Sequence, residues 1–329
     1  MIRVQEATKI YRVPVPSEGR FAGIRNLFHM NYTDRTVVDH ISFDIRDGES
    51  VCYIGPNGAG KSTTVKMLSG ILMPTSGSVS VNGLDPCRNR KENARNIGVV
   101  FGQKTSLWWD VPVIDSYRLL KEMYGISDAA FRKNLELFCD LLEMESFLNS
   151  PVRQLSLGQR MRADLAAALL HDPEILFLDE PTIGVDIVAK ARIREFISEL
   201  NSTRGITVMV TTHDMADMEK IVDRVIVIDK GKIYYDGTVA AMKAKYGKKR
   251  RIDLTFTEED PEISIPGLTE ISSSPFSRSF SFHTDELTAE QTIAKLTALP
   301  LHITDISVQQ TDIEEIVRDI YLQSGRTEK

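Results

Sequence analysis

The stretch Gly55-Pro56-Asn57-Gly58-Ala59-Gly60-Lys61-Ser62-Thr63 decides the fold of this chain. Its pattern is G-x-x-x-x-G-K-S, in which glycines let the backbone turn tightly and point successive N–H groups at a phosphate. The apolar run 51–54 before it predicts a buried strand, and residues 64–68 after it predict a helix whose N-terminus faces the same anion. We therefore expect Lys61 to reach the β- and γ-phosphates of a nucleotide, and Ser62 to bind Mg²⁺.

Composition bounds the class of protein. The chain has 329 residues, 42% of them hydrophobic and 26% charged, which is typical of a globular protein with room for two domains. No apolar run approaches the roughly 20 residues of a membrane span, and residues 1–12 are too charged for a secretory signal. The net charge of −6 argues against binding nucleic acid through bulk charge. The scattered cysteines, Cys52, Cys87 and Cys139, lack metal-site spacing and indicate reduced, cytosolic thiols.

The N-terminal part predicts a β-rich unit with an insertion. Residues 1–12 and 36–48 have strand character. Between them, residues 21–28 carry apolar side chains at the spacing of one short amphipathic helix. This segment is either a surface loop packed on its own domain or a contact with a partner or a membrane surface.

The remaining chain predicts two domains. Strands are expected at 175–178, 207–210 and 225–228, and a mostly helical block at about 105–170 interrupts this α/β pattern. Basic residues crowd around Gly247, which we interpret as a solvated linker rather than a lipid or nucleic acid site. We place a boundary there, with domains at 1–245 and 246–329. The second reads strand, polar loop, strand, helix, strand, helix, which predicts a small α+β domain.

Two further strands end in residues that suit nucleotide chemistry. Asp179 and Glu180 follow an apolar strand, and ligands of α/β sheets lie at the carboxyl ends of strands. We expect Asp179 to hold Mg²⁺ through water, and Glu180 to orient or deprotonate the attacking water. His213 follows the strand at 207–210 and could reach the γ-phosphate by the same rule, although a lone histidine there is also compatible with a structural role.

A helix with a free N-terminus adds a possible anion contact. Ser156 fits the N-cap of a helix over 160–170, and Asp172-Pro173 marks its end. The bare N–H groups and dipole of such a helix attract an anion, although an ordinary capped helix has the same sequence pattern.

In this order, these segments make residues 1–245 resemble the nucleotide-binding subunit of ABC transporters. Walker A is Gly55–Thr63, and Walker B is Ile175–Glu180. The signature motif is Leu155–Gln159, where Leu157 replaces the first glycine of the usual L-S-G-G-Q. The resemblance implies an α/β P-loop NTPase fold with β-rich and helical subdomains, followed here by the small C-terminal α+β domain.

The resemblance also assigns roles to single residues. Gln103 matches the Q-loop, which contributes to catalysis and to the Mg²⁺ site with Ser62 and Asp179, while His213 matches the switch histidine. Tyr11 matches the aromatic that stacks on adenine, with Tyr32 and Phe28 as rivals because the insertion separates Tyr11 from Walker A. The remaining nucleotide-binding candidates are all in matched motifs: Gly55, Pro56, Asn57, Gly58, Ala59, Gly60, Lys61, Ser62, Thr63, Ser156, Gly158, Gln159 and Asp186. Lys61, Glu180, His213 and Gln103 are the catalytic candidates.

The family implies partners as well as chemistry. Two ATPase subunits, identical or paralogous, are expected to sandwich ATP head to tail, so that Ser156 and Gly158 act in trans. A separate membrane permease is expected to contact residues 104–110, which contain Trp108 and Trp109. The alternative for these tryptophans is a place in the core of the helical subdomain. We expect a cytoplasmic protein, peripheral on the inner face of the cell membrane, with no nucleic acid partner.

Direction of transport rests on analogy. One nucleotide-binding domain with a C-terminal extension is similar to the ATPases of bacterial drug, lipid and polysaccharide exporters, particularly those like the daunorubicin-resistance ATPase. An importer ATPase with a regulatory C-terminal domain, or an ABC ATPase without a transport role, are the alternatives.

Overall fold

The computed structural model describes residues 1–15, 31–102, 104–213, 221–257, 259 and 263–324. The chain divides into two compact units, Met1–Asp236 and Gly237–Lys329, each described by itself below. The interpretation of the two predicted parts, 1–245 and 246–329, as domains stays a prediction.

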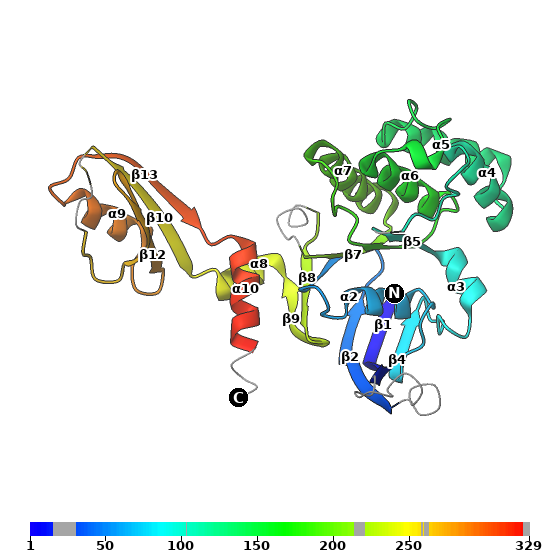
Figure 1. Ribbon diagram of the computed structural model, residues 1–329, viewed down its shortest axis with the longest axis horizontal. Coiled ribbons are helices and arrows are strands. Elements are labelled where there is room, and N and C mark those ends of the chain that lie inside the picture. The colour runs from blue at the N-terminus through cyan, green and yellow to red at the C-terminus, as the bar shows by residue number, and fades with distance from the viewer. Residues whose placement is uncertain (16–30, 103, 214–220, 258, 260–262, 325–329) are drawn as a thin grey trace, which may run out of the picture. The chain divides into compact units, whose positions relative to one another are not determined.

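The first unit is built on a mostly parallel six-stranded sheet (Figure 1). Its strands, in spatial order, are β5 (Ile97–Phe101), β6 (Ile175–Asp179), β7 (Thr207–Thr212), β3 (Ser50–Ile54), β8 (Arg224–Asp229) and β9 (Lys232–Thr238). All residues of β3, β6 and β7 are buried, which explains their continuous apolar runs. The register pairs Asp179 and Tyr53 with Thr211, so the carboxyl ends of β6, β7 and β3 meet at one edge.

A second, antiparallel sheet of the same unit contains β2 (Asn31–Ile45), β1 (Ile2–Val15) and β4 (Ser76–Val81), in that order. Pairing between β1 and β4 ends at Thr8 with Ser76. Beyond Thr8 the strands β1 and β2 continue together to the pair Val15 and Asn31, so the sheet extends as a two-stranded ribbon. The helix predicted at 21–28 lies outside the described residues.

One apolar cluster joins the two sheets. It includes Ile2 and Val4 of β1, Phe43 of β2, and Phe177 of β6, all of which are buried. The helix α2 (Lys61–Leu68) contacts both sheets through β2, β4 and β6. The phosphate loop therefore rests on the best-packed part of the unit.

The predicted helical segments are helices in the structure and lie together as a block in Figure 1. They are α4 (Val113–Tyr124), α5 (Asp128–Leu141) and α6 (Leu157–Leu169). The predicted packing stripe of α6, Met161, Leu165 and Leu169, is buried. The described residues of this unit also contain the short helix α3 (Arg90–Asn96), the 3₁₀ turn Val152–Gln154 and the long helix α7 (Ile187–Arg204).

The second unit has an antiparallel sheet in the order β11 (Thr269–Ser274), β12 (Ser277–His283), β10 (Lys249–Phe256) and β13 (Ile303–Gln310). Its core contains Ile252, Leu254 and Phe256, which alternate along one face of β10. The helix α9 (Ala289–Thr297) contributes Leu296 to this core, and α8 (Val239–Tyr246) packs on α10 (Ile313–Ser324). We predicted a polar loop where β11 forms, because that edge strand exposes all its residues and shows no apolar alternation.

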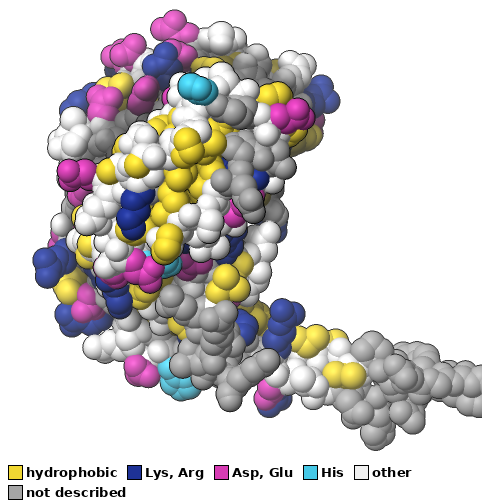
Figure 2. Space-filling view, turned by 90° about the vertical axis from the view of Figure 1, so that its left-hand side faces the viewer, with side chains coloured by type: hydrophobic (Ala, Val, Ile, Leu, Met, Phe, Trp, Pro, Cys, Tyr) yellow, Lys and Arg dark blue, Asp and Glu magenta, His cyan; other side chains and the backbone are white. Residues whose placement is uncertain are grey.

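Two surface properties bear on function. In the part of the chain that the structure describes, no helix is both long and apolar enough to cross a membrane. Figure 2 shows one face of the molecule, on which acidic and basic side chains are interspersed.

Candidate nucleotide-binding site

The phosphate loop has the conformation that its glycines predict. Gly58 and Gly60 have φ values of 84° and 109°, which only glycine adopts readily. A Cβ atom on Gly60 would also lie 2.7 Å from the carbonyl oxygen of Val37. Helix α2 begins at Lys61 without a side-chain cap, so its first N–H groups are available to an anion.

The loop opens into a cavity of about 560 Å³. The cavity is lined by residues from Walker A, Walker B and the neighbouring strands: Val37, Asn57, Gly58, Gly60, Lys61, Ser62, Thr63, Lys66, Ile71, Phe101, Gly102, Lys104, Asp179, Glu180 and Ile183. Of the predicted loop residues, Gly55, Pro56 and Ala59 do not line it. The side chain of Ala59 is buried in the apolar cluster, and its backbone makes hydrogen bonds with Pro56 and Gly231.

Lys61 is held inside the loop by three oxygen atoms. Its side chain is 5% exposed, and its Nζ donates to the carbonyl oxygens of Gly55 at 2.7 Å and Pro56 at 3.2 Å. The same Nζ lies 3.2 Å from Oε1 of Glu180. A buried cation needs such partners, and a phosphate group that entered the cavity would replace the carboxylate as the counter-charge.

The carboxylate of Glu180 lies between the side chains of Lys61 and His213. Its Oε2 lies 2.7 Å from Nδ1 of His213, while its Oε1 faces Lys61. The residue has a φ of 57°, a left-handed conformation that is uncommon outside glycine. Gly102 permits this turn, because a Cβ there would lie 2.2 Å from the carbonyl oxygen of Glu180. The strained backbone directs the carboxylate away from the sheet edge and toward the histidine.

Thr211 is a site residue to which we assigned no role from the sequence. Its Oγ1 donates to Oδ1 of Asp179 at 2.6 Å and accepts from the backbone N–H of Glu180 at 3.2 Å. One hydroxyl thus fixes both acids of Walker B. The signal was present in the sequence, since Thr211 ends a strand next to His213 and the ends of adjacent parallel strands meet.

The residues present fit a magnesium ion. Ser62 and Asp179 both line the cavity and offer a hydroxyl and a carboxylate, the oxygen ligands that Mg²⁺ prefers. The described residues contain no cluster of three His, Cys, Asp or Glu that could hold a metal alone. Gln103, the third predicted ligand and a catalytic candidate, lies outside the described residues.

The signature residues pack against the segment Ile183–Asp186, which matches the D-loop of the family, and against the start of α7. Ser156 caps α6, accepting from the N–H of Gln159, whose Oε1 accepts from the N–H of Ser156 in return. A Cβ on Gly158 would lie 2.9 Å from that of Ala189, in the first turn of α7 that Asp186 caps. The predicted signature residues and Asp186 do not line the Lys61 cavity of their own chain.

Leu157, which departs from the usual signature, has a packing role. Its Cδ2 would lie 3.0 Å from a Cβ placed on Gly184. Gly184 has a φ of 67° in the turn before Asp186, so the leucine side chain covers a backbone that carries no side chain of its own. Leu157 therefore packs the signature segment against residues 183–186.

The adenine candidates lie on the ribbon of β1 and β2. Tyr11 is 36% exposed, with the ammonium of Lys9 at 5.4 Å from its ring centre, and it does not line the cavity. Tyr32 is 59% exposed and pairs with Pro14 across the ribbon. Phe28 lies outside the described residues. The assignment of Tyr11 to adenine stays a prediction.

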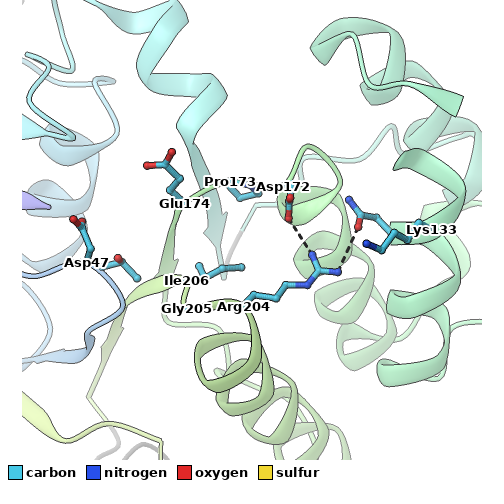
Figure 3. Close-up of a pocket in the computed structure, with 10 residues that line it drawn as sticks. Asp47, Lys133, Asp172, Pro173, Glu174, Arg204, Gly205 and Ile206 are labelled. Carbon is cyan, nitrogen blue, oxygen red and sulfur yellow. Dashed lines mark hydrogen bonds and ion pairs between the residues drawn. The ribbon is translucent and has the colours of Figure 1, made fainter. Parts of the chain in front are cut away.

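A second cavity, of about 640 Å³, lies at the opposite, amino ends of β6 and β7 (Figure 3). There Arg204 at the end of α7 donates to Oδ1 of Asp172 at 3.1 Å and to Oδ1 of Asn134 at 3.4 Å. Its guanidinium also lies 5.4 Å from the ring centre of Phe138. These contacts satisfy the side chain of Arg204 within the protein and tie α5 to α7.

Comparison with known proteins agrees with this geometry. A family model described as "ABC transporter" matches residues 38–183. NatA of Bacillus subtilis, an ABC transporter ATP-binding protein, is 32% identical over 67% of this chain and 87% of its own length. The chain belongs to the ATP-binding proteins of ABC transporters, a family of ATPases.

This chain covers different shares of the length of its other relatives. "Probable multidrug ABC transporter ATP-binding protein YbhF" of Escherichia coli is 36% identical over 69% of the chain, which spans only 39% of YbhF. "Linearmycin resistance ATP-binding protein LnrL" of Bacillus subtilis is 29% identical over 90% of the chain and 96% of its own length. Among solved structures, a dimeric, post-hydrolysis ATP-binding cassette bound to ADP and Pi is 27% identical with a TM-score of 0.61. That likeness covers 73% of this chain and 99% of the cassette.

Proposed function

We propose that this chain binds ATP with Mg²⁺ in the Lys61 cavity, hydrolyses it, and powers export through a separate membrane permease. The observation that carries the proposal is the carboxylate of Glu180, set between Lys61 at 3.2 Å and His213 at 2.7 Å at the mouth of the phosphate loop. An acid in this position has one partner, Lys61, that can bind phosphate, and a second, His213, at hydrogen-bond distance.

The chain's own residues divide the work of hydrolysis. Lys61 leaves Glu180 for the β- and γ-phosphates, which frees the carboxylate to orient the attacking water. His213 steadies the γ-phosphate, and Thr211 keeps both acids of Walker B in place. Ser62 and Asp179, with Gln103, would hold Mg²⁺, which when bound would supply positive charge against the charge that develops on the phosphates.

A head-to-tail dimer would complete the site. Within one chain, Ser156 and Gly158 do not line the Lys61 cavity, so their phosphate contacts would be made in trans. Ile187 and Val188, directly after Asp186, are 82% and 72% exposed, which marks this surface as one that a second subunit would cover. The dimeric cassette that resembles this chain supports the arrangement. The second subunit is either a copy or a paralogue.

The permease contact is proposed at residues 104–110. Trp108 and Trp109 are 41% and 49% exposed, which favours an interface anchor over a place in the core. Binding there would hold the chain on the inner face of the cell membrane as a peripheral protein. Export is favoured by the printed names of YbhF and LnrL, which refer to multidrug transport and linearmycin resistance.

The test is purification of the tagged full chain from detergent-solubilised membranes, followed by mass spectrometry and an ATPase assay. A co-purifying multi-span protein together with Mg²⁺-dependent hydrolysis would support the proposal. Hydrolysis with ribosomes or DNA-repair proteins in place of a membrane protein would leave the ATPase and reject the transporter role. Purified chain that neither binds nor hydrolyses ATP would reject both.

A further inference from the structure

A buried acid in α6 holds the segment that carries both tryptophans. The carboxyl of Asp164 is 5% exposed, and its Oδ1 accepts three hydrogen bonds at 2.9 Å. The donors are Oγ1 of Thr105, Oγ of Ser106 and the backbone N–H of Ser106. Burial raises the pKa of Asp164, and these bonds partly offset that effect. The three donors belong to two adjacent residues, so Asp164 serves this segment and no other part of the described chain.

The same segment has further ties to α6 and to the turn before it. The guanidinium of Arg160 lies 5.3 Å from the ring centre of Trp109. The N–H of Arg153 donates to the carbonyl oxygen of Trp109 at 2.9 Å, and its side chain lies 3.5 Å from Asp110. Asp164 is the buried member of this set and therefore the one whose loss leaves polar groups without a partner.

Helix α6, which carries Asp164, begins directly after the signature residue Ser156. Ser156 caps that helix about two turns before Asp164. Asp164 and Ser156 thus belong to one helix with continuous backbone hydrogen bonds, which gives a displacement of residues 105–109 a physical route to Ser156.

We propose that Asp164 is a positioning residue that couples the exposed Trp108–Trp109 surface to the signature end of α6. The inference rests on the proposed function, in which Ser156 contacts the ATP of the second subunit and the tryptophans contact a permease. By reciprocity of coupling, ATP at one end of α6 must alter the environment of the tryptophans at the other.

The chain offers a direct probe, since Trp108 and Trp109 are its only tryptophans. Emission of the full chain is followed while Mg²⁺-ATP is added, in a Glu180→Gln background that accumulates the ATP-bound state. ATP binding is measured separately by equilibrium dialysis. We expect the parent to show a saturable change in emission, and Asp164→Ala to lose most of that change with its ATP affinity retained.

Two further variants separate coupling from folding. Tyr117→Phe is the matched control, because it removes a buried hydrogen bond at 2.8 Å to Ala163 of the same helix and leaves the three hydrogen bonds of Asp164 to residues 105 and 106 in place. It should keep the emission change. Thr105→Val/Ser106→Ala removes two donors from the partly exposed loop, leaves Asp164 in place, and should lose the change as Asp164→Ala does.

The outcomes are distinct. A full emission change in the folded Asp164→Ala or Thr105→Val/Ser106→Ala protein overturns the coupling role. A parent that binds ATP in dialysis but shows no emission change also overturns it, while leaving the nucleotide site intact. A parent that binds no ATP fails at the proposed function instead. If Asp164→Ala does not fold, the loop variant decides the question alone.

Discussion

At the scale of single residues, the site is a set of oxygen and nitrogen atoms that already contact one another. Glu180 bridges Lys61 and His213, and Thr211 bridges Asp179 and Glu180. When a nucleotide binds, each of these contacts is either kept or exchanged for a contact with a phosphate group. The residue-scale predictions below follow from which contact is removed.

Glu180→Gln should retain ATP binding and lose turnover by about 10²-fold or more, because an amide cannot accept a proton from water. It also removes the negative partner of Lys61, so ATP affinity should not fall. Steady-state ATPase rates and equilibrium dialysis measure the two effects. Glu199→Gln, an exposed site on α7, is the control and should match the parent. An unchanged rate in Glu180→Gln would refute the role given to this acid.

Thr211→Val should lower both stability and activity. The buried carboxyl of Asp179 loses a hydrogen bond of 2.6 Å, so we expect the free energy of unfolding to fall by about 1–3 kcal/mol. Urea unfolding and ATPase rates are the measurements. Thr211→Ser keeps the hydroxyl and should restore most of both; equal defects in the two variants would show that the methyl group, not the hydroxyl, matters.

Tyr11→Ala should weaken ATP binding by about 2- to 10-fold through lost stacking on adenine. Affinity for ATP is compared with affinity for inorganic triphosphate, which has no base and should bind both proteins equally. Tyr32→Ala, across the same ribbon, should leave both affinities unchanged. If Tyr32→Ala is the variant that loses ATP selectively, the adenine assignment belongs to Tyr32.

At the scale of elements, the contacts that matter join helices to strands. Arg204 ends α7 and donates to Asp172 before β6 (Figure 3) and to Asn134 of α5. Its guanidinium also lies over the ring of Phe138. Asn134 is 6% exposed, so its carbonyl oxygen has little access to water if the arginine is removed.

Arg204→Ala should therefore reduce the free energy of unfolding by about 1–2 kcal/mol. Arg192→Ala, on the same helix, loses only exposed ion pairs with Glu143 and Glu195 and should cost about 0.5 kcal/mol or less. Urea unfolding of both variants tests the contrast. Equal losses would mean that the buried amide of Asn134 does not distinguish the two sites.

Local patterns predicted the elements that a few consecutive residues determine. Glycines at 55, 58 and 60 next to a buried apolar run identified the phosphate loop, because backbone conformation there depends on residues close in sequence. Three features escaped prediction for physical reasons. The strand β11 exposes every side chain, the ion pair of Lys61 with Glu180 joins residues distant in sequence, and the bonds of Asp164 depend on how α6 packs.

At the scale of the whole molecule, the described residues include one apolar cluster in each unit, and the two clusters share no residue. The second unit, Gly237–Lys329, carries its own sheet and buries Ile252, Phe280 and Phe282 within it. Independent cores predict independent unfolding, since cooperativity follows packing.

The fragment 237–329 should unfold cooperatively on its own, and the fragment 247–329 should not reach the same stability. The shorter fragment lacks α8, on which α10 packs, and would uncover buried Ile316. Chemical unfolding followed by circular dichroism compares the two. Equal stability would support the predicted boundary at 245–246 over a division at 236–237.

The ribbon formed by β1 and β2 has a consequence for how this chain tolerates change in length. Val15 and Asn31 are register partners at the end of the described ribbon, so the segment that joins them begins and ends at adjacent points. Lengthening a connection between adjacent points costs little free energy, because closure entropy grows only with the logarithm of length. Peptide tags or whole small modules inserted between these two residues should therefore leave the ATPase core intact. The position is suited to insertions, both in engineering and in evolution.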